Sequence, residues 1–191
     1  MAATGAAQGK YDVEAMSQSE IADVAKVNQS AADLIKGVNA GTKKLDDIAK
    51  AESSIASDLA GESLVTAFMD VTPTNGGVQL ADGRYQVTLS VPALTKGMTD
   101  VKVLHFSTAR NVWEVITPSN VDLNNKELTF EVQDLSPIAI IAKVDASQAV
   151  TNTAGTSPKT GVDSTNTVPF AGAAVVLLGA AAVVAFRKKN A

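Results

Sequence analysis

An uncharged apolar run near the C-terminus constrains this chain more than any other feature of its sequence. The run covers residues 168–186, and Arg187, Lys188 and Lys189 follow it directly. At about 1.5 Å per residue, a helix of about 19 residues is roughly 28 Å long, close to the hydrocarbon thickness of a bilayer. A helix is the expected form in lipid, because every backbone amide must be hydrogen-bonded within the segment. The positive-inside rule keeps the basic triplet cytoplasmic and places the N-terminal bulk outside.

A buried helix of a soluble domain is the alternative interpretation of this run. Such a helix normally shows polar residues every three or four positions, and residues 168–186 contain none. The sequence therefore predicts a single transmembrane helix here.

A short polar motif precedes the run. Ser157, Pro158, Lys159, Thr160 and Gly161 read SPKTG, and a polar spacer follows them. Motif, spacer, apolar run and basic tail, in this order, resemble the cell-wall sorting signal of Gram-positive surface proteins, usually written LPXTG. The resemblance implies that a sortase transpeptidase cuts between Thr160 and Gly161 and links the protein to peptidoglycan. Ser157 stands where the usual leucine would be, which resembles the signals of some class B-type sortases of anaerobic Firmicutes.

The N-terminal end lacks the export signal that such a motif requires. Residues 1–17 have neither a basic n-region nor an apolar h-region. Either the sequence is the C-terminal part of a longer exported protein, or Met1 is the true start and the last helix is a tail anchor that is never cleaved. We favour the first interpretation, because all four parts of the sorting signal are present.

Composition excludes several kinds of site. The chain of 191 residues has no cysteine, which excludes disulfides, thiolate metal sites and cysteine nucleophiles. His105 is the single histidine, so we expect no histidine-built metal site. We also expect no cofactor. With 16 basic and 20 acidic residues and no basic cluster outside the tail, nucleic-acid binding has no electrostatic basis. Asp46, Asp47 and Asp122 lack the spacing of a calcium loop and are interpreted as solvated carboxylates.

The N-terminal part of the chain is predicted to be helical. Residues 1–16 are rich in alanine and glycine at their start and are expected to be disordered. Residues 17–61 show helical periodicity, with capping-box spacing between Ser17 and Glu20 and a second helix expected over 43–60. We interpret this segment as a helical hairpin packed on its neighbour, with a partner-binding helix as the alternative.

Residues 62–144 change to the period of strands. About six short strands separated by turn signals predict an antiparallel β-sandwich-like domain, and hence an α+β chain. The expected strands are 64–71, 85–91, 101–106, 111–116, 128–132 and 138–143. Residues 145–156 are rich in Ser, Thr, Asn, Ala and Gly and are predicted to form a flexible stem before the sorting signal at 157–191.

A second resemblance covers residues 101–142. This segment contains a hydrophobic-Leu-His-aromatic strand, Trp-Glu, a loop with proline, a Thr-Phe strand, and Ser-Pro before apolar residues. In these features it is similar to a small β-domain that recurs near the C-termini of Firmicutes surface proteins. The resemblance implies a structural or stalk-proximal module without an assigned activity.

Two places in the β-domain could carry chemistry. His105-Phe106-Ser107 resembles the cleavage site of autoprocessing β-domains in death-domain and nuclear-pore proteins, which implies a histidine-activated attack of Ser107 on the peptide bond before it. The alternative is a histidine on the inner or edge face of a strand and a serine that opens a turn. Trp113 with Glu114 could form a sugar-binding face, although a lone tryptophan is more often a core residue.

The sequence as a whole predicts a non-enzymatic protein of the cell wall and cell surface. It would pass through the plasma membrane, with a sortase and peptidoglycan as partners and an unknown surface ligand as a further one. Its role would be display, spacing or adhesion. Self-processing before Ser107 and an uncleaved tail anchor are the alternatives.

Overall fold

The computed structural model describes residues 1–135 and 137–144, which all belong to one compact unit. In this part of the chain lie four α-helices and two short 3-10 helices, namely η1 (Gly5–Ala7), α1 (Gln18–Val27), α2 (Gln29–Asn39), α3 (Leu45–Ala51), η2 (Ser53–Ile55) and α4 (Ala56–Leu59). The strands are β1 (Ala2–Ala3), β2 (Tyr11–Ala15), β3 (Ser63–Leu64), β4 (Met69–Pro73), β5 (Tyr85–Ser90), β6 (Met98–Ser107), β7 (Val112–Ile116), β8 (Asn120–Asp122), β9 (Glu127–Val132) and β10 (Ile138–Val144). The predicted α+β class with antiparallel sheets is confirmed.

The larger sheet has the strand order β2-β4-β10-β6-β7, and β3 pairs with β10 as well. Its central ladder joins β10 to β6 antiparallel, from Ile138 opposite His105 to Val144 opposite Met98. The next ladder pairs β6 with β7. The turn at residues 108–111 connects these two strands, and Asn111 in this turn has a positive φ of 54°. This local hairpin fixes which residues of β6 and β7 face each other.

The smaller sheet has the order β1-β5-β9-β8. Its main ladder joins β5 to β9 along their whole length, from Tyr85 opposite Val132 to Ser90 opposite Glu127. Val87 and Leu89 of β5 are fully buried, whereas Thr88 between them is half-buried. This alternation is the pattern of a sheet with one face in a core and one face toward solvent.

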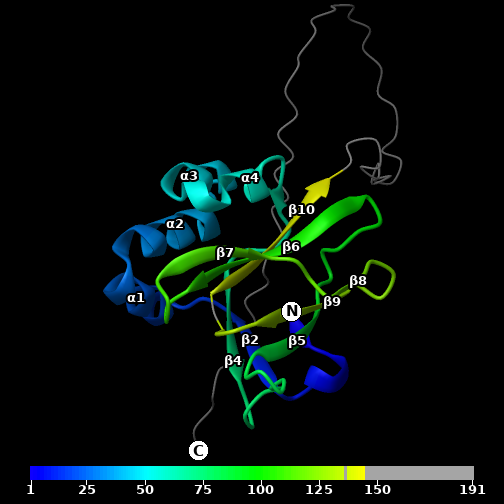
Figure 1. Cartoon of the computed structure of the whole chain (residues 1–191). Helices are drawn as coiled ribbons and strands as arrows, with labels where there is room; N and C mark the ends of the chain where they lie inside the picture. Colours follow the sequence, from blue (N-terminus) through cyan, green and yellow to red (C-terminus); the bar gives the residue numbers. More distant parts are fainter. Residues whose placement is uncertain (136, 145–191) are drawn as a thin grey trace, which may run out of the picture. The chain divides into compact units, whose positions relative to one another are not determined.

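Both faces of the larger sheet are buried, and each lies in its own hydrophobic core. Leu104 and Phe106 of β6 point toward the helices, and Val101 and Val103 point toward the smaller sheet, because successive side chains of a strand alternate. The molecule is therefore built in three layers, with the helices on one side of a two-sheet sandwich. Figure 1 shows the helices gathered along the sheet that contains β6, β7 and β10.

Local sequence signals explain where the first helices begin. The capping box predicted at Ser17 and Glu20 is present, since the Glu20 amide donates to the Ser17 hydroxyl and the Ser17 amide donates to the Glu20 carboxylate. Asn28 starts α2, where its side-chain oxygen accepts from the Ala31 amide at 3.0 Å. The helix expected over 43–60 is interrupted after Ala51, where serines with poor helix propensity follow.

The structure corrects the expectation that residues 1–16 are disordered. β1 pairs with β5 in the smaller sheet, and β2 pairs along its full length with β4 in the larger sheet. Tyr11 is 4% exposed, and its hydroxyl accepts from the Val78 amide at 2.9 Å. The alanine-rich composition suggested too little apolar surface for a core. However, Ala7 is itself buried, and the backbone supplies the hydrogen bonds.

The strand expected over 64–71 is also divided. β3 ends at Leu64 and β4 begins at Met69, and the segment between them breaks the regular pairing, although the amides of Val65 and Thr66 still donate to the Ile140 carbonyl of β10. Its conformation is held by Asn39 of α2, whose side chain accepts from the Phe68 amide at 2.7 Å and donates to the Phe68 carbonyl at 3.1 Å. This contact ties the helical layer to the sheet. The helical segment thus packs on the β-domain, with α1–α4 inserted between β2 and β3.

Among the residues that the structure describes, no helix is long and apolar enough to cross a membrane. The predicted stem at 145–156 and the sorting signal at 157–191, with its helix at 168–186, lie outside those residues.

The helical layer should contribute strongly to stability through Ile35, which is 0% exposed in the core beneath α2. Ile35→Ala is expected to lower the free energy of unfolding by about 2–5 kcal/mol, because it removes buried methyl groups and leaves a cavity. Urea unfolding followed by the fluorescence of Trp113, the single tryptophan, measures this. Val27→Ala is the control, since Val27 is 44% exposed. Equal stability of the two variants would contradict this account of the core.

Candidate functional site

The β6–β7 hairpin places a histidine and a glutamate opposite each other on the inner face of the sandwich. His105 of β6 pairs with Glu114 of β7 in the ladder. The neighbouring residues Phe106 and Trp113 pair as well, but their side chains point to the helical core. His105 is 0% exposed, so its polar ring lies in an otherwise apolar layer and requires partners.

Two carboxylates and one guanidinium surround His105. Its Nδ1 lies 2.8 Å from Glu114 Oε1, and its Nε2 lies 3.7 Å from Asp134 Oδ1. Arg110 donates to both oxygens of Glu114 at 2.7 and 2.9 Å and to Asp134 at 3.0 Å. We call His105, Arg110, Glu114 and Asp134 the His105 cluster. It joins the hairpin to the loop between β9 and β10.

The hydrogen bonds define the charges in the His105 cluster. The hydrogen bond from His105, and next that from Arg110, lower the pKa of Glu114 to about 2, against the opposing effect of burial. Glu114 is therefore ionised at neutral pH and can only accept, so Nδ1 of His105 carries a proton. The hydrogen bonds to Glu114 and Asp134 raise the pKa of Arg110 further. Within the described residues, His105 Nε2 and Asp134 Oδ1 are buried without a hydrogen-bond partner, and they face each other.

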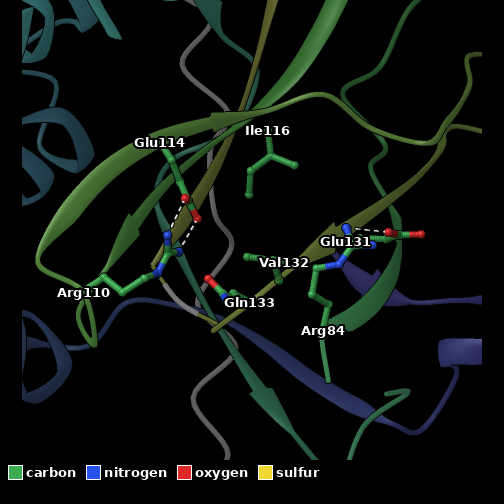
Figure 2. A pocket seen from close by; sticks show the side chains of 7 residues that line it. All are labelled: Arg84, Arg110, Glu114, Ile116, Glu131, Val132 and Gln133. Atoms are coloured by element: carbon green, nitrogen blue, oxygen red, sulfur yellow. Dashed lines mark hydrogen bonds and ion pairs between the residues drawn. The ribbon is translucent and has the colours of Figure 1, made fainter. Parts of the chain in front are cut away.

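A shallow pocket of about 190 Å³ lies beside the His105 cluster, as Figure 2 shows. Arg110 and Glu114 stand on one side of it and Arg84 with Glu131 on the other, with Ile116 and Val132 between them. Arg84 is paired with Glu131 at 2.8 Å and with Asp82 at 2.7 Å. Since both guanidinium groups already bind carboxylates of the same chain, their charges are compensated without a ligand. The side chains around this pocket are therefore held in place by ion pairs within the chain.

The structure does not bring His105 and Ser107 into the contact that self-cleavage would need. The Ser107 hydroxyl accepts from the Arg110 amide at 3.0 Å, and both ring nitrogens of His105 face carboxylates. Ser107 is 0% exposed and lies in the ladder opposite Val112. The peptide bond before it belongs to a regular strand, which matches the structural alternative given for this tripeptide.

Trp113 is a core residue in the structure. It is 8% exposed, with its ring centroid 5.7 Å from that of Phe68 and 5.1 Å from that of Phe106. Its partner in the proposed sugar-binding face, Glu114, points to the opposite side of the sheet and binds His105. These two side chains therefore do not form one face.

A second cluster of charged side chains lies at the end of the β6–β10 ladder away from His105, and we call it the Glu62 group: Glu62, Asp100, Lys102 and Lys143. The side chain of Glu62 is fully buried and lies 3.2 Å from Lys102, which also pairs with Asp100 at 3.0 Å. Burial raises the pKa of Glu62. The hydrogen bond from Lys143, and next that from Lys102, lower the pKa of Asp100 to about 2. These contacts tie β6 and β10 together where the described part of the chain ends.

Among the described residues, no group of three or more His, Asp or Glu side chains could hold a metal ion. Asp122 instead closes a turn by accepting from the amides of Asn124 and Asn125 at 2.9 Å. Asp47 caps α3 by accepting from the Lys44 amide at 2.8 Å, and Asp46 lies in the same exposed first turn. The sorting motif Ser157–Gly161 and the basic triplet at 187–189 lie outside the described residues.

Comparison of the sequence and the fold with family models, curated proteins and solved structures finds no match. The sequence features did not single out Arg110 or Asp134 as part of a site. The hairpin alone predicts the pairing of His105 with Glu114, whereas Asp134 reaches the cluster only through the crossing from the smaller sheet to the larger one.

The pKa of Glu114 predicts a pH dependence of stability. Its folded value of about 2 lies below the ordinary 4.5, so its ionised form stabilises the fold above pH 4.5 and this contribution is lost as the pH falls toward 2. We expect Glu114→Gln to be less stable than the wild type at neutral pH, with a difference that shrinks across this window. Urea unfolding at a series of pH values measures it. Glu52→Gln, in the helical layer, is the control, and a difference for Glu114→Gln that does not change with pH would contradict the prediction.

The placement of Ser107 predicts that the purified chain does not cut itself. A denaturing gel with intact-mass spectrometry should show one full-length species over days at neutral pH, unchanged in Ser107→Ala. Two fragments that divide before Ser107, absent from the Ser107→Ala variant, would support the self-processing alternative instead.

Proposed function

We propose that this chain is a non-enzymatic cell-surface protein that a sortase anchors covalently to peptidoglycan. The observation that supports this is the C-terminal order of SPKTG at 157–161, a polar spacer, the apolar run at 168–186 and the basic triplet at 187–189. Each part alone is a weak signal, since five-residue motifs occur by chance. The four together, in this order at the C-terminus, fit one process.

The chemistry of the motif suits the proposal. A sortase thiolate attacks the Thr160 carbonyl carbon, the bond to the Gly161 nitrogen breaks, and a thioacyl intermediate forms. An amine of the peptidoglycan cross-bridge then displaces the thiolate. The substrate must present extended, uncrowded backbone, which Pro158 and Gly161 favour. Thr160 is thus a residue of the substrate, and the enzyme supplies the catalytic groups.

The position of the motif relative to the folded part is also suitable. The last strand among the described residues, β10, ends at Val144, and twelve residues at 145–156 separate it from Ser157. At about 3.3 Å per residue such a segment can extend about 40 Å. A flexible stem of this reach would let a membrane-bound enzyme act on Thr160 without contact with the β-domain. A single transmembrane helix at 168–186 would hold the substrate in place until then.

We infer that the role of the folded part is display, spacing or adhesion. In the described residues, the charged groups of the His105 cluster and of the Glu62 group are paired within the chain, and we identify no nucleophile activated by a base. These arrangements favour a structural β-domain over an enzyme. The unknown surface ligand of the sequence-based prediction remains part of this proposal.

The proposal predicts a specific C-terminal peptide. In a Gram-positive host that expresses the exported protein, digestion of purified cell wall should release a peptide that ends at Thr160 and carries a cross-bridge fragment. Thr160→Ala should abolish this peptide and leave the protein in the membrane, while Thr165→Ala in the spacer should not. An intact C-terminal end found only in membranes, for the wild type as well, would instead indicate an uncleaved tail anchor.

A further inference from the structure

A groove of about 390 Å³ runs between α1 and the strand ends beside it, and the function proposed above does not use it. Its apolar surface comes from segments far apart in the sequence: Met16 after β2, Val24 and Val27 of α1, and Leu135 and Pro137 before β10. Val27 is 44% exposed, so its side chain is open to solvent. The groove therefore offers apolar surface to solvent.

The charged side chains that line this groove are all acidic. They are Glu20 and Asp23 of α1 and Asp70 of β4, and no lysine, arginine or histidine is among the described lining residues. Lys26 pairs with Asp23 at 2.6 Å, but both side chains are mostly exposed and such a pair contributes little. The three carboxylates therefore keep a negative potential beside the apolar surface of the groove, with Lys26 as a partner of Asp23.

The acidic side chains of the groove also lie close to other acidic side chains, and the repulsion between these like charges destabilises the fold. Glu14 of β2 lies directly opposite Asp70 in the ladder, and like charges at such positions are destabilising. Glu20 and Asp23 follow each other at the i,i+3 spacing of α1, where like charges repel as well. Glu20 has a structural role as the capping residue at Ser17, whereas Asp23 and Asp70 form no such cap.

The lining of the groove differs from that of the pocket in Figure 2 in its charge. The lining of the pocket in Figure 2 holds two guanidinium groups, Arg84 and Arg110, and two carboxylates, Glu114 and Glu131. In the groove below α1, three carboxylates and five apolar side chains lie together without a cation in the lining. A ligand that carries a positive charge beside apolar groups would complement this lining.

We propose that this groove docks a polypeptide segment of a partner protein that carries lysine or arginine next to apolar side chains. Its cations would pair with Asp23 and Asp70, and its apolar side chains would cover Met16, Val27 and Leu135. Electrostatic complementarity of this kind determines the rate and specificity of association, and burial of the apolar surface supplies much of the affinity. The proposal does not depend on sortase anchoring, since it rests on described residues alone.

The test uses the full chain and a fluorescent synthetic peptide of alternating lysine and leucine, with glutamate–leucine and lysine–serine peptides as matched probes. Fluorescence anisotropy should show binding of the lysine–leucine peptide that weakens from about 0.01 M to about 0.15 M salt, because salt screens exposed charges. Amide chemical-shift changes should cluster on α1, on Met16 and on Asp70. The glutamate–leucine and lysine–serine peptides should bind more weakly or not at all.

Variants with a matched charge change complete the test. Asp23→Asn with Asp70→Asn should weaken binding by about 3- to 30-fold, the effect of losing two exposed charge pairs. Asp33→Asn with Asp46→Asn, in α2 and α3 away from the groove, removes the same charge and should leave the affinity within about two-fold. Val27→Glu should also weaken binding and, at an exposed position, keep the fold. Equal losses in both double variants, or shift changes spread over the molecule, would overturn the proposal.

Discussion

The fold depends on burying both faces of β10. Five consecutive residues, Ile138 to Ala142, are 0% exposed, and they alternate between the helical core and the core of the sandwich. A strand that is apolar on both faces cannot lie at a surface, so the chain must supply a layer on each side of it. The helices form one layer and the smaller sheet forms the other. The tie between Asn39 and Phe68, and the crossing from β9 to β10, hold these layers against the central strand.

The same constraint explains why the His105 cluster exists. β6 is the neighbour of β10 and is buried with it, yet its alternating side chains include one histidine on the sandwich side. Near the end of the ladder, the loop after β9 brings Asp134 to the ring while Glu114 lies across the hairpin. Arg110 in the turn forms ion pairs with both carboxylates. The polar cluster is thus a way to bury a histidine, and its hydrogen bonds and ion pairs contribute to stability.

The local signals in the sequence predicted structure that depends on residues a few positions apart. They did not predict structure that depends on contacts between distant segments. The capping box at Ser17 and the strands of the β6–β7 hairpin depend on neighbours a few residues apart, so their patterns could be recognised. The ordered structure of residues 1–16 could not be recognised, because β2 becomes a strand only by pairing with β4, far along the chain. The division of 64–71 likewise depends on a distant contact, that of Asn39 with Phe68, whereas the break within 43–60 follows serines of poor helix propensity. For the site, the hairpin gives His105 and Glu114, while Asp134 and the groove below α1 result from non-local contacts.

The direction of β10 connects the two proposals. The groove below α1 includes Pro137, just before the start of β10, whereas the chain leaves the described domain at Val144 at its other end. The strand runs six residue steps from Ile138 to Val144, a length of about 20 Å at 3.3 Å per residue. A domain held at the cell surface through the segment after Val144 would therefore present the groove at the end away from its attachment. The Glu62 group would lie at the attached end. Its ion pairs join β6 to β10 close to Val144, where the chain leaves the described domain.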